Sequence, residues 1–552
     1  MSDPGSHARS DSPSHVRYWI VGLATLMAVL LYLHRYCMSF TERFIREELR
    51  LSNTEISFLV SAFFIAYGIG QVPSGWLSDR YGARRMLTLY ILVWSIMTGV
   101  MGLAGSFLMV MIFRLGLGLG QAGAYPTGAL MVSKWMPPSQ RGLASGIISM
   151  GGRLGAVLAP ILTGYLLLAY RPAEPRITTD DILDSTQICR DLVLPHEKKP
   201  HVDELSQKIR SRLSAQVNEI LETGAKGDSP PPFPAKLRLV VDELNDHNWY
   251  DLVDAERFDV HPNRNTAERN RELLENAFPK SIRKLQGLGW RPTFYVYGVV
   301  GIVFALVFWL VVRDAPALHP LCNTEEADLI GASSVSVGSS SGVGALPLGH
   351  LLKSRSLWFS SIQQFFTNFA WLFIPTTFQR YLLEVHHVPL EERGWMTSVP
   401  IALGILGMVA GGWLTDSLTN RVGKFWGRCL PMSLTRFLAM LGYLACMFFD
   451  SPWQVTLALG VVAIATDLGT PAVWAFCQDI GGKHVGSALG WGNMWGNFGA
   501  VLSLNVLNLV IEGFGWNMTF LACAIAFFLS GLAGFGIDAR IPLVPAKTEL
   551  PE

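Results

Sequence analysis

Seven ionisable side chains fall inside long apolar stretches of this 552-residue sequence. A charge in an apolar medium is costly, so such side chains are rare and usually face a water-filled cavity. All but one of the seven are cationic or can become so, and a cavity with that surplus needs a compensating anion, of which a bound solute is the simplest. The seven are His34, Arg35, Arg114, Arg153, Arg380, Arg436 and Asp467.

Arg35 is the leading candidate for the anion contact. Its planar guanidinium can hold a carboxylate or a phosphate through two parallel hydrogen bonds. Tyr32 lies three residues earlier, on the same helical face, and Tyr67, with Gln71 one turn further on, could share the cavity. The alternatives are an arginine that snorkels or pairs in a gate, and tyrosines that serve in packing.

Arg153 is flanked by the glycines of the range 151–155, which let neighbouring helices approach closely and leave room for a guanidinium. Two roles stay open for it: a second anion contact, as a dicarboxylate would need, and a salt bridge within its own half of the chain.

Trp474, Asn493 and Asn497 form a third group of candidates. Amides suit hydroxyl-rich solutes because each supplies both donors and an acceptor, and an indole can stack on a sugar face. Interhelical hydrogen bonding for the asparagines and helix packing for Trp474 are the alternatives.

The composition is that of a membrane protein. Half of the residues are hydrophobic, only 16% are charged, and the mean hydropathy is +0.31, whereas about 25% are charged in a typical soluble chain. A spanning helix needs about 20 apolar residues, and that length yields about twelve candidate helices. The net charge of +1 gives no reason to expect nucleic acid, and seven scattered cysteines form no metal-ligand or disulfide pattern.

Basic residues in the short loops set the expected orientation. They gather in alternate loops, which places both termini in the cytoplasm of a multi-pass plasma-membrane protein. The first apolar run has no cleavage site and is expected to stay as a helix. A long polar insert then lies outside, and its lack of a glycosylation sequon favours a bacterial inner membrane.

The expected organisation is an all-α fold of two six-helix bundles. It comprises a cytoplasmic tail (1–17), first-bundle helices one to five (18–170), the extracytoplasmic insert (171–289), helix six (290–313), a cytoplasmic linker with a Ser/Gly run (314–353), second-bundle helices seven to twelve (354–540) and a cytoplasmic tail (541–552).

The two bundles carry related sequences. The stretch Gly-Trp-Leu-Ser-Asp from Gly75 to Asp79 matches Gly-Trp-Leu-Thr-Asp from Gly412 to Asp416, and Gly-Ala-Val-Leu occurs at 155–158 and 499–502. An internal duplication in a multi-helix membrane protein is typical of a transporter whose site lies between the halves.

These stretches also resemble a known superfamily. Residues 75–85 resemble the loop between helices two and three of the major facilitator superfamily, and Arg114 with Gly118 resembles its helix-four motif. A finer resemblance, to the anion:cation symporters that carry hexuronate, galactonate, glucarate and sialic acid, rests on the ranges 32–35, 118–126, 313–325 and 474–497. This resemblance implies that Arg35 binds a substrate carboxylate, that Arg114 serves the transport cycle, and that Asp79, Arg80 and Arg84 form a cytoplasmic gate.

The chain departs from that family where the coupled protons are expected. His34 and Gln121 occupy positions at which the family usually has carboxylates. Gln121 cannot titrate and is grouped with the substrate-binding residues. His34 and Asp467 remain as candidate coupling groups, and so does exchange of anions without a coupled cation.

The expected function is secondary transport of a small organic anion, such as a sugar acid, coupled to H⁺ or Na⁺, by a monomer without a cofactor or metal. An exchanger of phosphorylated or carboxylated solutes is the alternative within this class, and a non-transporting receptor with a ligand-sensing insert is the alternative of another class. The absence of a nucleotide-binding motif argues against an ATP-driven pump or another enzyme.

Overall fold

The computed structural model describes residues 12–170, 176–196, 199–226, 233–253, 258, 260, 265–279, 281–282, 289–331 and 346–544. Within these ranges all regular structure is helical, apart from one isolated bridge between Ile182 and Ile282. Helices suit an apolar chain because they satisfy every backbone donor and acceptor internally. The Ser/Gly run of the linker and most of the first tail lie outside the described residues.

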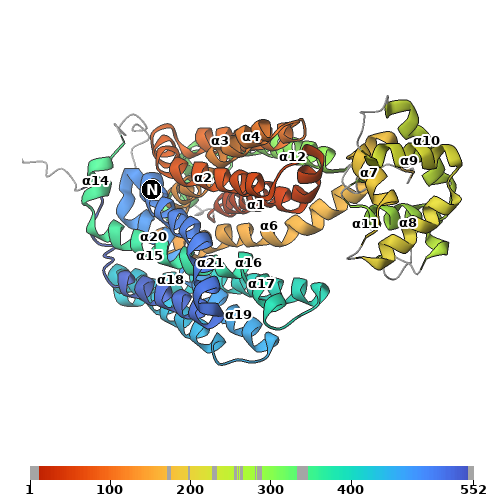
Figure 1. The fold of residues 1–552 in the computed structure, drawn as a ribbon. Coiled ribbons are helices and arrows are strands. Elements are labelled where there is room, and N and C mark those ends of the chain that lie inside the picture. The colour runs from red at the N-terminus through yellow and green to blue at the C-terminus, as the bar shows by residue number, and fades with distance from the viewer. Residues whose placement is uncertain are drawn as a thin grey trace, which may run out of the picture.

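The first bundle is drawn in red to orange with one green helix in Figure 1. α4 and α5 form one line of helix interrupted at Gly123. Its helices are α1 (Val16–Leu49), α2 (Asn53–Tyr81), α3 (Ala83–Met101), α4 (Phe107–Ala122), α5 (Ala124–Trp135), α6 (Arg141–Ala169) and α12 (Trp290–Val311).

The second bundle lies beside the first (teal to blue in Figure 1). Two long stretches, α18 and α21, each contain one glycine with φ of 81°, Gly423 and Gly515, where the helix is broken; only glycine adopts this conformation without strain. The helices are α15 (Arg355–Trp371), α16 (Phe373–Thr376), α17 (Phe378–Glu384), α18 (Leu390–Cys446), α19 (Pro452–Leu468), α20 (Thr470–Gly481) and α21 (Val485–Gly534).

Membrane-spanning character is evident in both bundles. In the described ranges, seven helical stretches are long and apolar enough to cross a bilayer. Several contain more than one helix, as α18 and α21 do, so the figure of about twelve spans stays a prediction.

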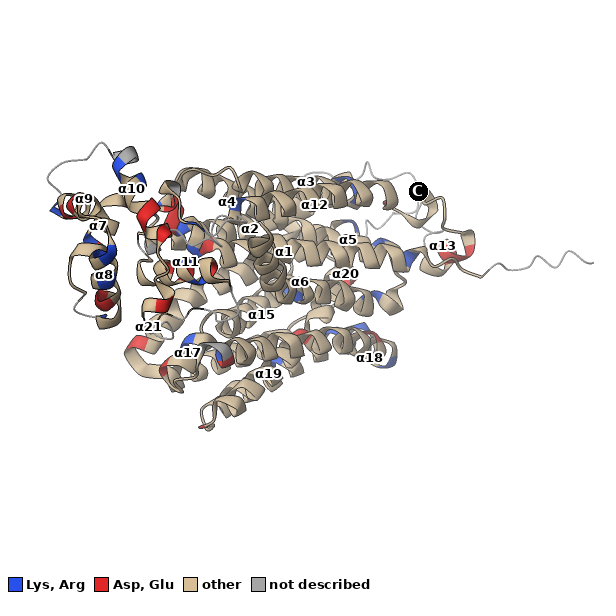
Figure 2. Cartoon of the chain, turned by 90° about the vertical axis from the view of Figure 1, so that its right-hand side faces the viewer, with Lys and Arg blue, Asp and Glu red and all other residues tan. Residues whose placement is uncertain are grey.

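The insert is a separate helical unit with its own core, drawn in yellow-green at the far end of α6. Trp249 is fully buried at its centre, and its charged side chains contrast with the mostly uncharged bundles in Figure 2. The two ends of the insert meet, because Ile182 bridges Ile282 and the Leu183 N–H donates to the Ser281 carbonyl. The helices are α7 (Ser185–Val193), α8 (Pro200–Arg212), α9 (Ala215–Lys226), α10 (Phe233–Asp246) and α11 (Thr266–Ala277).

Short helices complete the described chain. They are α13 (Thr324–Ile330) and α14 (Leu348–Lys353), with 3₁₀ turns η1 (Pro138–Gln140), η2 (Thr179–Asp181), η3 (Tyr250–Leu252), η6 (Pro316–Leu318) and η9 (Gly482–His484). The bundles thus have two ends, named here the insert end, where α6 leads to α7, and the linker end, where α13 lies (Figure 2).

Glu326 of α13 fastens the start of α1 at the linker end. Its fully buried carboxylate accepts hydrogen bonds from the Ser14 hydroxyl, from the backbone N–H groups of Val16 and Arg17, and from the Arg17 guanidinium at 2.9 Å. Burial opposes ionisation, but these donors and the Arg17 charge outweigh it, so the pKa of Glu326 lies below its ordinary value of 4.5.

We expect Glu326→Gln to lower the free energy of unfolding by about 2 kcal/mol at pH 7, because a charged acceptor is replaced by a neutral amide. A lowered pKa means that the carboxylate stabilises the fold above pH 4.5 and that this contribution is lost as the pH falls through the folded-state pKa. The gap in thermal unfolding temperature between wild type and variant, measured in detergent, should therefore close on acidification. Equal unfolding temperatures at pH 7 would contradict this role.

Candidate functional site

Asp79, at the linker end of α2, joins the two bundles. Its carboxylate accepts hydrogen bonds from the N–H groups of Gly486 and Ser487, both at 2.8 Å, and from the Ser487 hydroxyl at 2.7 Å. These two residues lie in the first turn of α21, where N–H groups lack intrahelical partners and the helix dipole favours an anion. A side chain on Gly75 would overlap the Gly486 carbonyl, so glycine is needed for this approach.

Asp416 of α18 makes the mirror-image contact. It accepts from the N–H groups of Gly142 and Leu143, at 2.9 and 2.8 Å, in the first turn of α6. Each bundle therefore caps a helix of the other with one aspartate. Asp416 was not predicted as a gate residue. The repeat of Gly75–Asp79 at Gly412–Asp416 could have indicated it.

The two arginines predicted for the gate stay within the first bundle in this structure. Arg80 is exposed and lies over the rings of Trp76 and Tyr81. Arg84 donates to the Trp309 carbonyl at 3.0 Å and lies over the Trp309 ring. Asp79 is thus the member of the predicted gate that spans the two halves.

Arg35 lies at the centre of an aromatic cage. The rings of Tyr32, Phe63 and Tyr67 are 4.9, 5.1 and 4.4 Å from its guanidinium carbon. Its Nε donates to the Gln121 side-chain oxygen at 3.1 Å. Its Nη2 is buried and makes no hydrogen bond within the described part of the chain. One buried donor of this half-buried side chain is therefore open to an acceptor from outside the protein.

Gln121 is held so that it faces Arg35 with its oxygen. Its amide nitrogen donates to the Leu31 carbonyl at 3.0 Å, which fixes the oxygen on the arginine side. A neutral acceptor orients Arg35 without cancelling its charge.

Gln71 presents a second set of open hydrogen-bonding groups. The side chain is fully buried, and neither its oxygen nor its nitrogen has a partner among the described residues. It lies one turn beyond Tyr67 on α2, whose Gly68 lies against the side chains of Asn497 and Phe498 of α21. Asn497 donates to the Asn493 carbonyl, so this predicted pair meets α2 close to Tyr67 and Gln71.

Trp474 of α20 contacts the first bundle through Tyr125 of α5, with ring centroids 5.4 Å apart in an edge-to-face arrangement. Tyr125 also packs against Tyr32 at 6.4 Å. A line of rings therefore connects Trp474 to the Arg35 cage. The sequence pattern does not predict Phe63 or Tyr125 as site residues, although Tyr125 lies within the range 118–126 that resembles the symporter family.

Arg153 is neutralised across the interface between the bundles. It makes a bidentate salt bridge with Asp467 of α19, at 3.0 Å from Nε and 2.7 Å from Nη2, and lies over the Trp371 ring. The sequence left open a second anion contact and a salt bridge within one half; the structural partner belongs to the other half. Arg436 also faces Asp467, and it donates to the Thr466 carbonyl at 2.7 Å.

His34 and Arg114 lie inside the first bundle rather than between the halves. His34 is fully buried; its Nδ1 is 3.1 Å from the Thr98 hydroxyl, and its ring packs against Tyr297 of α12. Arg114 of α4 donates to the Leu59 carbonyl at 3.2 Å, and its guanidinium lies over the ring of Phe63 on α2. His34 and Arg35 are adjacent in sequence, but His34 faces the interior of the first bundle whereas Arg35 faces the aromatic cage.

Hydrogen bonds between the two bundles, called cross-half hydrogen bonds here, occur along α6 from its first turn to its middle. Among the described residues they start at Gly142 and Leu143, continue with Ser145, which accepts from Gln478, and end at Arg153. The Arg153–Asp467 pair is thus the cross-half hydrogen bond nearest to the insert end. The linker end is sealed by both aspartate caps.

Comparison with protein families identifies the group to which this architecture belongs. The model described as Major Facilitator Superfamily matches residues 24–173 and 285–504. The chain belongs to this superfamily. The interval between the two matched ranges, 174–284, falls within the insert.

Individual relatives agree with this assignment. The chain is 23% identical to a probable sulfoacetate transporter, SauU, of Cupriavidus necator over 540 residues, covering 96% of this chain and 95% of the relative. It is 22% identical to the hexuronate transporter of Bacillus subtilis over 537 residues, covering 95% of each. Both relatives are transporters, and the expectation of a multi-pass membrane transporter rather than an enzyme is confirmed.

A solved structure supports the fold. The fucose:proton symporter FucP of Escherichia coli superposes with a TM-score of 0.56 at 12% identity, covering 94% of this chain and 98% of that one. The predicted all-α major facilitator fold is confirmed.

We expect Asp79→Asn and Asp416→Asn each to weaken the contact between the bundles by about 1 kcal/mol, and the double variant by about 2 kcal/mol, because a charged acceptor is replaced by a neutral amide whose NH₂ group cannot accept. Spin labels at the exposed residues Ser139 and Asn420, one in each half at the linker end, should then show a longer-distance population. Asp450→Asn, which removes an exposed carboxylate elsewhere, is the matched control. An unchanged distance distribution in the double variant would show that the caps do not hold the halves together.

Proposed function

We propose that this protein is a secondary transporter of a small organic anion and that Arg35 binds the carboxylate of its solute. The observation that carries the proposal is the buried Nη2 of Arg35, a charged donor with no partner among the described residues. A carboxylate placed there would supply the missing acceptor and charge, and the surrounding tyrosine rings would contact the carbon skeleton.

The site favours a hydroxylated monocarboxylate such as a hexuronate. With Arg153 already paired to Asp467, Arg35 is the guanidinium at the interface whose charge has no carboxylate partner in the described chain. The open amide of Gln71, with Asn493 and Asn497 nearby, is suited to sugar hydroxyls because amides both donate and accept. The relatives named for hexuronate and sulfoacetate transport lend support to an anionic substrate.

The sealed end is proposed to face the cytoplasm and the insert to lie outside, in a bacterial inner membrane. The charges of the short loops support this orientation. The described conformation would then be closed to the cytoplasm, with the solute reaching Arg35 from the insert end.

Proton coupling is proposed to use Asp467. It is a buried carboxylate that pairs across the bundles at Arg153, beyond the gate aspartates. Protonation of Asp467 would break its bidentate salt bridge with Arg153. Because this salt bridge joins the two bundles, proton binding would favour their separation.

We expect Arg35→Gln to weaken binding of glucuronate by about 2–3 kcal/mol, roughly 30- to 150-fold, because a charged hydrogen bond to the carboxylate is lost. Arg35→Lys should recover only part of the loss, since a point charge cannot reproduce the bidentate geometry. Isothermal titration of purified protein measures both. Exposed Arg421→Gln, with the same change of charge, is the control. Unaltered affinity in Arg35→Gln would remove Arg35 from the site.

For Asp467→Asn we expect solute accumulation driven by an imposed pH gradient to be lost from proteoliposomes, while counterflow of labelled solute persists, because the variant can no longer bind or release a proton there. His34→Gln should keep the gradient-driven accumulation. If His34→Gln abolishes accumulation and Asp467→Asn does not, the proton carrier is His34. If the wild-type protein moves labelled solute only when unlabelled solute is present on the opposite side of the membrane, the protein is an exchanger.

A further inference from the structure

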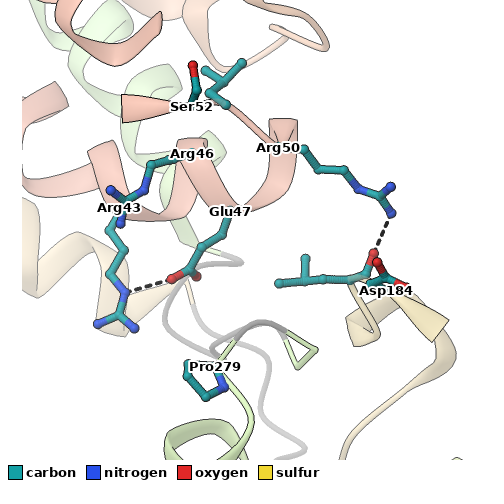
Figure 3. Close-up of a pocket in the computed structure, with 9 residues that line it drawn as sticks. Arg43, Arg46, Glu47, Arg50, Ser52, Asp184 and Pro279 are labelled. Carbon is teal, nitrogen blue, oxygen red and sulfur yellow. Dashed lines mark hydrogen bonds and ion pairs between the residues drawn. The ribbon is translucent and has the colours of Figure 1, made fainter. Parts of the chain in front are cut away.

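A groove of about 750 Å³ lies between the insert end of α1 and the start of the insert. Figure 3 shows three arginines of α1 around it, with the insert below. The volume falls in the range of small-molecule sites, roughly 300–1,000 Å³. The charged groups that line it are Arg43, Arg46, Glu47, Arg50 and Asp184.

The lining carries more positive than negative charge. It has three guanidinium groups against two carboxylates. One carboxylate, Glu47, is 2.7 Å from Arg43. The other, Asp184, accepts from the N–H groups of Thr186 and Gln187 as the cap of α7. Since Arg43 pairs with Glu47, the net charge of the lining is +1.

The groove arginines lie on the face of α1 that leads to the Arg35 cage. Tyr32, Tyr36, Ser39, Arg43, Arg46 and Arg50 follow one another at spacings of four and three residues, which places them in one stripe along a helix. Ser39 and Arg43, in the middle of the stripe, are exposed. Arg46 is eleven residues from Arg35, about 16 Å along the axis at 1.5 Å per residue.

The groove has fixed walls on both sides. Glu48 holds the end of α1 against α12, accepting from the Trp290 indole at 2.7 Å and from the Arg291 guanidinium at 2.9 Å. Arg50 donates to the Leu183 carbonyl of the insert at 2.5 Å. Since Leu183 lies beside the bridge between Ile182 and Ile282, Arg50 holds the insert where its two ends meet.

We propose that this groove is a second anion-binding site, built jointly by α1 and the insert, which takes up the organic carboxylate before it reaches Arg35. The proposal rests on the proposed function, in which the solute is a carboxylate that approaches from the insert end. The surplus charge raises the local concentration of the anion, and the α1 stripe leads it inward.

Binding to the full-length protein in detergent separates the two sites. The probe is glucuronate, observed by saturation-transfer NMR. Arg35→Gln should lose uptake yet retain saturation transfer from the groove, and adding Arg43→Gln with Arg46→Gln should abolish the transfer. Lys236→Gln with Arg238→Gln, two exposed residues of α10 in the insert, is the control for the same loss of two charges and should retain the signal. Loss of transfer in Arg35→Gln alone, or its persistence when the groove arginines are removed, would overturn the second site.

Uptake kinetics give an independent readout. In an otherwise wild-type chain, Arg43→Gln with Arg46→Gln should raise KM roughly fourfold at low salt, with turnover unchanged, as expected for two unit charges about 10 Å from the anion in water. The effect should shrink at high ionic strength. A KM equal to that of the Lys236→Gln/Arg238→Gln control contradicts the groove, whereas unaltered uptake by Arg35→Gln contradicts the proposed function instead.

Discussion

The need of a buried guanidinium for acceptors organises this molecule. In an apolar interior a cation without a partner is costly, so each buried arginine is matched to particular groups. Arg17, Arg153 and Arg428 have carboxylates at 2.9, 2.7 and 2.8 Å. Arg114 and Arg436 have backbone carbonyls. Among the described residues, Arg35 has a neutral amide and aromatic rings in place of a carboxylate or a backbone carbonyl, and this difference in partners makes it the candidate for binding an anion.

A second constraint follows from the duplication of the chain. Two aspartates at equivalent places cap two equivalent helices in the opposite bundles, so the linker-end contact has approximate two-fold symmetry. Backbone N–H groups supply the donors on both sides, so the contact depends on glycine at the crossing points more than on the side chains of the capped helices. The contact therefore needs both the negative charge of Asp79 and the absence of a side chain at Gly75.

Periodicity and composition predicted the all-α membrane fold, and the repeat predicted two related bundles, because both depend on local sequence. Asp79 and Arg35 could be predicted as candidates because a short motif surrounds each of them. The partner of Arg153 could not be predicted, since Asp467 lies 314 residues away on a facing helix and no local pattern links them. The position of His34 also escaped prediction: adjacent residues on a helix point about 100° apart, so His34 faces α3 and α12 while Arg35 faces the cage.

The pairing of the two ends of the insert has a consequence for the architecture of the chain. Because the bridge between Ile182 and Ile282 brings these ends together, the segment between them forms a closed loop with its own core. Such a unit can be lengthened, shortened or exchanged while α6 and α12 keep their separation, since loop closure costs little more as a loop grows. The first bundle is therefore a module with a built-in attachment point, through which a soluble domain can be joined to a transporter without a change to its helices.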